Sequence, residues 1–125
     1  MKRLLIAAGL LAAPASYALA GPWEDGMAAY NRGDYLPAIQ IVRPLAQQGN
    51  ARAQGLIGAM YLRGQGVAKS SKRAFMWLSL ASARGDAKAK TELHEVSQSM
   101  TPEELAQARE MMQACEASNY RSCEY

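Results

Sequence analysis

The chain has two cysteines and one histidine, the side chains that most often carry nucleophilic, redox or metal chemistry in a small protein. Cys115 and Cys123 lack the C-x-x-C spacing of redox motifs. A disulfide between them would fold the C-terminal tail back over the last predicted helix, and free or intermolecular thiols are the alternative. The spacing disfavours redox catalysis. Two Cys and one distant His form no standard zinc site, so zinc binding is disfavoured as well.

No other residue set indicates catalysis. His94 lies beside the apolar stripe of a predicted helix, where a lone His is usually a surface residue, and His94-Glu95 lacks the second His of H-E-x-x-H. G-x-S-x-G and S-x-x-K are both absent. Glu24-Asp25 and Glu103-Glu104 start predicted helices, where carboxylates favour the helix dipole. We therefore expect no catalytic residue, cofactor or metal, although two acids across a cleft, as in a glycosidase, stay open at this stage.

The first twenty residues have the layout of a secretory signal peptide. Lys2-Arg3 precedes an apolar run over residues 4–13, and residues 18–20 read A-L-A before the expected cut. We predict cleavage before Gly21, with cleavage after Ala15 or an uncleaved anchor as alternatives. A run this short is a poor membrane span, which needs about 20 residues. Residues 21–125 would then form one domain in the bacterial periplasm or outside the cell.

The charge of residues 21–125 is close to neutral. Twelve Lys and Arg face eleven Asp and Glu, which disfavours nucleic acid as a partner. The distribution is uneven, because residues 63–90 carry seven Lys and Arg against one Asp, whereas residues 91–125 carry seven Glu against two Arg. These segments are either solvated faces of neighbouring helices that attract each other or a bipolar docking surface.

Glycines and capping residues divide this domain into six helices. The predicted helices cover about 22–32, 35–48, 51–62, 71–84 and 87–99, and the last begins at the capping box T-P-E-E of residues 101–104. Asn50, Ser70 or Ser71, and Asp86 are the predicted caps. No segment alternates with period two, so we expect no strands. Trp77 and Tyr61 are expected to fill the core, with ligand stacking as the alternative.

One residue pattern recurs along the chain. The motif A-x-Y-x-R-G of residues 28–33 returns at 59–64, and Ala38, Gly49 and Ala51 have counterparts of the same type 36 positions later. The offset grows from 31 to 36 because the loop of the second motif is longer. Five more residues separate Gly64 from Ala74 than separate Gly33 from Ala38. Repeat arrays tolerate an insertion that is confined to one loop, so we expect a stack of helical hairpins.

Residues 53–87 resemble the Sel-1-like repeat family, which is related to the tetratricopeptide repeats. The family pattern is A-x-x-x-L-G-x-x-Y-x-x-G-x-G-V, followed by an acidic position and A-x-x-W-Y-x-x-A-A-x-x-G. This chain supplies Ala53, Ile57 in place of Leu, Gly58, Tyr61, Gly64, Gly66, Val67, Ala74, Trp77, Ala81 and Gly85. It departs from the pattern at three positions, with Ser70 in place of the acidic residue, Leu78 in place of the Tyr and Ser82 in place of the second Ala. The match is looser over residues 28–51, and no motif follows residue 90.

This resemblance implies an all-α fold, an α/α superhelix or solenoid that serves as an interaction scaffold. About two helix-turn-helix repeats would cover residues 22–50 and 51–86. Capping helices over residues 87–115 and a tail over 116–125 would follow, in place of a third repeat.

Binding is the expected task of such an array, because its first helices form a concave surface. Arg52, Leu56 and Arg63 fall within about 40° of each other on the third predicted helix, away from the core stripe. We predict that they contact a peptide or a carboxylate-bearing partner; ordinary solvated surface is the alternative.

The leading hypothesis is an exported protein–protein interaction scaffold or adaptor of the cell envelope, a monomer or weak dimer whose partner is an envelope protein or peptide. Peptidoglycan-fragment binding or cell-wall hydrolysis is the second hypothesis. A structural envelope component without a discrete ligand is the third.

Overall fold

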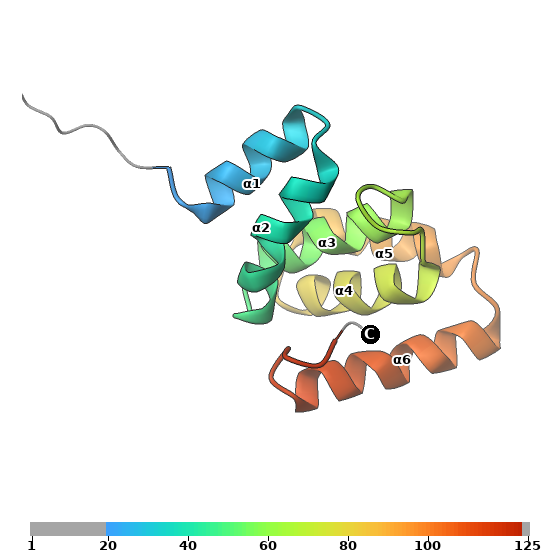
Figure 1. Ribbon diagram of the computed structural model, residues 1–125. Coiled ribbons are helices and arrows are strands. Elements are labelled where there is room, and N and C mark those ends of the chain that lie inside the picture. Colours follow the sequence, from blue (N-terminus) through green and yellow to red (C-terminus); the bar gives the residue numbers. More distant parts are fainter. Residues whose placement is uncertain (1–19, 124–125) are drawn as a thin grey trace, which may run out of the picture.

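The computed structural model describes residues 20–123, and within them the chain forms six helices and no strand (Figure 1). The helices are α1 (Pro22–Asn31), α2 (Tyr35–Gln47), α3 (Ala51–Arg63), α4 (Ser71–Ala83), α5 (Ala87–Ser97) and α6 (Pro102–Ala117). The predicted all-α class is confirmed. The predicted signal peptide lies outside the described residues, except for Ala20.

The predicted caps start the later helices. The side chains of Asn50, Ser70 and Asp86 each accept a hydrogen bond from the backbone N–H three residues on, at 3.0 to 3.2 Å. Thr101 and Glu104 form both hydrogen bonds of the predicted capping box. These bonds satisfy amides that have no partner inside the helix, which is why each helix begins where its cap stands.

The helix ends are also repeated. Four helices end in the same turn, in which the fifth amide of a six-residue segment donates to the second carbonyl and the sixth amide donates to the first, at 2.9 to 3.1 Å. The segments are 29–34, 45–50, 81–86 and 115–120. The fifth residue has a positive φ in every case, and it is Gly in three of the segments and Asn119 in the last. This is the hydrogen-bond pattern of a Schellman motif.

α5 ends at Ser97, two residues before the predicted end. The hydroxyls of Ser97 and Ser99 donate to the carbonyls of His94 and Val96, at 2.9 Å each. Serine side chains that bond nearby carbonyls compete with the helical backbone bonds, which accounts for the earlier end.

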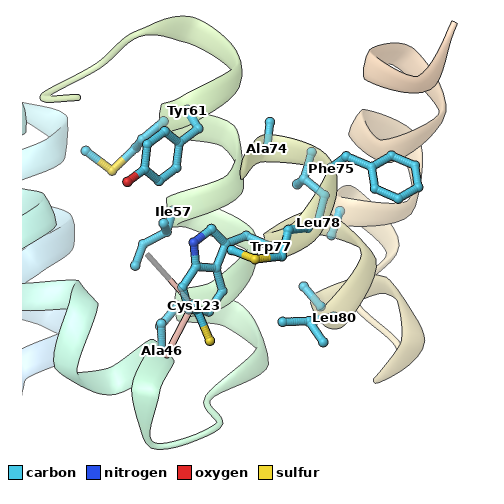
Figure 2. Packing of buried hydrophobic residues seen from close by; sticks show 14 of the residues in the cluster. Ala46, Ile57, Tyr61, Ala74, Phe75, Trp77, Leu78, Leu80 and Cys123 are labelled. Carbon is cyan, nitrogen blue, oxygen red and sulfur yellow. The ribbon is translucent and has the colours of Figure 1, made fainter. Parts of the chain in front are cut away.

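α4 lies at the centre of the fold. It contacts α3, α5 and α6, and it buries Ala74, Phe75, Met76, Trp77, Leu78, Leu80 and Ala81. Figure 2 shows Trp77 in the middle of the cluster, with Ile57 and Tyr61 of α3 on one side of the view and Leu80 on the other. Trp77 is 0% exposed and Tyr61 is 6% exposed, so both residues are in the core as predicted.

The long loop between α3 and α4 contacts the first hairpin, which α1 and α2 form. Gln65 accepts a hydrogen bond from the hydroxyl of Tyr30 in α1, at 3.0 Å. Gly66 has a φ of +76°, and a Cβ there would lie 2.7 Å from the carbonyl oxygen of Tyr35. The five inserted residues thus bring backbone against the start of α2, at a place where a side chain has no room.

α5 and α6 cover α4 from different sides, as Figure 1 shows. α5 packs on α3 and α4, whereas the main interface of α6 is with α4. The tail after α6 then returns toward the α2–α3 turn, where the ring of Tyr120 lies against Gly49 and Arg84 donates to the Gly49 carbonyl. The predicted disulfide between Cys115 and Cys123 is present, with Cα atoms 4.5 Å apart, and both cysteines are buried.

Replacing both cysteines with serine should lower the free energy of unfolding by about 2–3 kcal/mol, because the unfolded chain regains the entropy that this small loop removes. Urea unfolding measures the change. Reduction of the wild-type protein is the matched control and should give the same shift. In a Trp23→Phe background, the emission of Trp77 should move to longer wavelength as the tail is released. An unchanged midpoint in the serine variant would contradict this account.

At Gly58, α3 and α4 pack closely against each other. A Cβ on Gly58 would lie 2.7 Å from Cγ of Leu78 and 3.0 Å from its backbone N. Gly58→Ala should therefore lower the free energy of unfolding by about 1–2 kcal/mol, since overpacking outweighs the gain in helix propensity. Combining it with Leu78→Ala removes part of the clash, so the double variant should lose less than the sum of the two single losses. Strict additivity in thermal and urea unfolding would count against a clash.

Candidate functional site

A cleft of about 410 Å³ lies between the first helices of the successive hairpins. α1 has its main interface with α2, and α3 with α4, so α1 and α3 leave space between them that α5 borders. The lining residues are Trp23, Met27 and Tyr30 of α1; Arg52, Gly55, Leu56 and Arg63 of α3; and Asp86, Lys88, Ala89 and Glu92 at α5. We call this space the α1–α3–α5 cleft.

The three predicted contact residues all line the α1–α3–α5 cleft. Arg52 is the second residue of α3, Leu56 lies one turn further on, and Arg63 is the last residue of the helix. Leu56 is half-buried, whereas both arginines are exposed. The helical spacing therefore placed them on one accessible face. That they bind a partner stays a prediction.

One end of the cleft holds Arg52 against an aromatic ring. The guanidinium carbon of Arg52 is 4.6 Å from the ring centroid of Trp23. An arginine in this position is attracted by the negative face of the indole. The stacked guanidinium keeps its N–H groups at its edge, where they can donate to a carboxylate.

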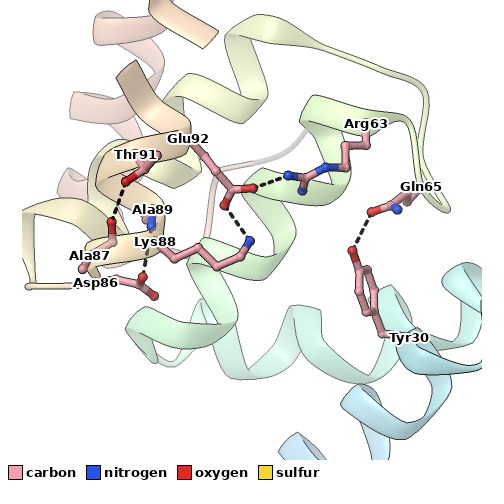
Figure 3. Close-up of polar contacts among 9 residues, drawn as sticks. All are labelled: Tyr30, Arg63, Gln65, Asp86, Ala87, Lys88, Ala89, Thr91 and Glu92. Atoms are coloured by element: carbon pink, nitrogen blue, oxygen red, sulfur yellow. Dashed lines mark hydrogen bonds and ion pairs between the residues drawn. The ribbon is translucent and has the colours of Figure 1, made fainter. Parts of the chain in front are cut away.

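The other end holds a cluster of three charges, shown in Figure 3. Nη2 of Arg63 lies 2.6 Å from one carboxylate oxygen of Glu92, and Nζ of Lys88 lies 3.0 Å from the other. The Glu92 side chain is 7% exposed, whereas those of Arg63 and Lys88 are 41% and 73% exposed. Partial burial by itself lowers the pKa of Arg63, but the hydrogen bond and charge of Glu92 outweigh it, so the pKa is raised.

A second carboxylate lies between these two ends. Oδ1 of Asp86 accepts the capping hydrogen bond from the backbone of Ala89, at 3.0 Å. Oδ2 lies 3.0 Å from the position that a Cβ on Gly55 would occupy, so the carboxylate faces α3 one turn after Arg52. The cleft lining therefore has three cations and two carboxylates, an excess of one positive charge. Along the cleft, positively and negatively charged side chains alternate.

The other residues considered in the sequence have structural contacts. His94 is exposed, with Nε2 3.1 Å from the side-chain nitrogen of Gln98. Glu24 and Glu104 each accept a hydrogen bond from the backbone three residues earlier, at the start of their helices. Between residues 20 and 123, no group of three or more His, Cys, Asp and Glu could hold a metal ion. The same part of the chain has no helix with the length and apolar character that crossing a membrane requires.

Sequence reasoning missed Glu92, Lys88 and Trp23 as parts of this site. Glu92 had a readable signal, because it lies three residues after Ala89 and four before Val96, on the same buried stripe of α5. A carboxylate on such a stripe needs a charged partner from another helix. Trp23 had no comparable signal, since its contact with Arg52 joins two different hairpins.

No protein-family model matches this chain, and the comparison with curated proteins finds no match either. The resemblance to Sel-1-like repeats thus rests on the motif of residues 53–87 and the looser match over residues 28–51.

The partly buried ion pair of Arg63 and Glu92 should be worth more than the exposed pair of Arg32 and Asp34, whose side chains are 63% and 54% exposed. In double-mutant cycles with alanine, we expect a coupling free energy of roughly 1–2 kcal/mol for the first pair and less than about 0.5 kcal/mol for the second. Urea unfolding of the four variants of each cycle gives both values. Equal coupling in the two cycles would contradict the stronger role of Glu92.

Proposed function

We propose that this chain is an exported Sel-1-like repeat protein that acts as an interaction scaffold or adaptor in the bacterial cell envelope. In this proposal the α1–α3–α5 cleft holds a segment of the partner. The observation that carries it is the cleft itself, which has cationic groups at both ends and an apolar side chain, Leu56, between them. Charge and apolar surface together in one groove suit a peptide better than a small apolar ligand.

Export is supported by two features far apart in the chain. The charge, apolar run and small residues of positions 2–20 have the order of a secretory signal. The disulfide of Cys115 and Cys123 belongs to a class of bond that persists in oxidising compartments such as the periplasm. We place the mature protein there or outside the cell, as a monomer or weak dimer.

We propose binding without turnover. Both oxygens of Glu92 are engaged by cations, and Asp86 caps α5. A glycosidase needs two carboxyl groups that can reach the same substrate bond, one of which gives up a proton. The contacts of Asp86 and Glu92 are instead those of counter-ions and caps. Fragments of peptidoglycan also carry carboxylates, so their binding is an arm of the test rather than the leading function.

A photo-crosslinking residue in place of Leu56 or Met27, in cells, should trap the same partner from both positions of the cleft. Gln40 on α2 is exposed outside the cleft and is the matched control position. Adding Arg52→Glu should reduce the Leu56 adduct roughly tenfold, which corresponds to about 1.4 kcal/mol of binding free energy. Mass spectrometry identifies the partner, and digestion with a muramidase tells a wall fragment from a protein. The proposal is wrong if the Gln40 position gives as much adduct as Leu56 and Met27, or if Arg52→Glu leaves the amount of the Leu56 adduct unchanged.

A further inference from the structure

We infer that the α1–α3–α5 cleft selects an extended segment with two side-chain carboxylates four to six residues apart and an uncharged apolar stretch between them. This inference rests on the proposed function and specifies its partner. It follows from the spacing of two cationic positions, the size of the cleft and the sign of the charge between them.

The two cationic ends have a defined separation. Arg52 and Arg63 are eleven positions apart on the continuous helix α3. A rise of 1.5 Å per residue separates them by about 16 Å along the axis, and eleven residues make about three turns, so both lie on the same face. Two anionic groups that meet both arginines must therefore be a similar distance apart.

The size of the cleft favours an extended segment over a helix. A helix about 10 Å across and 16 Å long has a volume of roughly 1,300 Å³, so most of its body would stay outside an open cleft of about 410 Å³. An extended chain is thinner and places a larger share of its atoms inside the cleft. An extended chain advances about 3.3 Å per residue, so 16 Å corresponds to about five residues. The reach of the arginine side chains extends this to four to six residues.

The charge between the ends decides what the middle of the segment contains. Asp86 faces Gly55, one turn from Arg52 and about two turns from Arg63, and it repels a third carboxylate between the two ends. Leu56, half-buried beside it, offers apolar surface instead. A segment with acidic side chains at the two ends and apolar ones between them is complementary to this order of charges.

Glu92 does not cancel the second anchor. It is a single carboxylate between two cations, Arg63 and Lys88, so one positive charge remains at this end. Arg63 uses Nη2 for Glu92, and its exposed fraction of 41% leaves other N–H groups accessible. Glu92 is thus a positioning residue, which holds the Arg63 guanidinium at the rim of the cleft.

Fluorescein-labelled peptides with acetylated N-termini and amidated C-termini test this spacing, because only their side chains are then charged. The set has one composition, Leu, Ala and two Glu, with the Glu residues about two, five or nine positions apart. In anisotropy titrations with the mature chain, the five-spaced peptide should bind at least tenfold more tightly than the other two and than its Gln version. Arg52→Glu and Arg63→Glu should each remove this preference, whereas Gln40→Glu, the matched exposed change, should leave it intact.

Charge reversal gives the decisive arm. A peptide with Lys and Glu five positions apart should bind the Arg52→Glu variant more tightly than it binds the wild type. Circular dichroism verifies that each variant is folded. Binding that is independent of Glu spacing, or the absence of charge-reversal rescue, would overturn the inference. If the Leu56 adduct still depends on Arg52 in cells while all peptides bind alike, the spacing rule fails and the proposed scaffold function stands. If no adduct depends on the cleft, the proposed function fails as well.

Discussion

The helix α4 is apolar on nearly every side, and seven of its thirteen residues are buried. A helix of this kind is stable only when other elements surround it. α3 covers one side, α5 and α6 cover others, and Cys123 of the tail belongs to the same core. Each of these elements therefore has its place because α4 must be kept from water. A single α3–α4 hairpin would leave Trp77 and its neighbours exposed, which explains why the chain continues for two more helices and a cross-linked tail.

The cleft is a consequence of this arrangement. α3 packs on α2, α4 and α5, and its remaining face, with Arg52 and Leu56, borders the cleft. α5 has to contact both α3 and α4, which brings Glu92 within 2.6 Å of Arg63. α1 packs on α2, and it contacts the rest of the fold through Tyr30, which bonds to the inserted loop, and through Trp23, which lies against Arg52. The same packing that buries α4 thus leaves the α1–α3–α5 cleft open, and it lines this cleft with charges that cannot enter the core.

Local signals made most of the fold readable in advance. Caps such as Asn50 and Asp86 act within one helical turn, so their effect on helix starts follows from the sequence alone. The common face of Arg52, Leu56 and Arg63 is likewise a property of one helix. Glu92 and Trp23 were missed because their roles depend on how separate helices lie against each other. The inserted loop was read as a tolerated addition, and its contact with Tyr30 needed the three-dimensional arrangement.

The two ends of the cleft have in common that the protein itself holds each arginine in place. Arg52 is stacked on Trp23, and Arg63 is bonded to a carboxylate that is nearly inaccessible to water. A free arginine loses considerable side-chain entropy when it binds a ligand. Here that loss has largely occurred on folding, while the exposed edges of both guanidinium groups keep donors for a partner. The buried Glu92 is costly to the fold unless it is paired, so its pairing with Arg63 and Lys88 ties the geometry of the cleft to the stability of the domain. A partner that fits these fixed positions gains affinity from their rigidity, and a partner with a different spacing of charges does not.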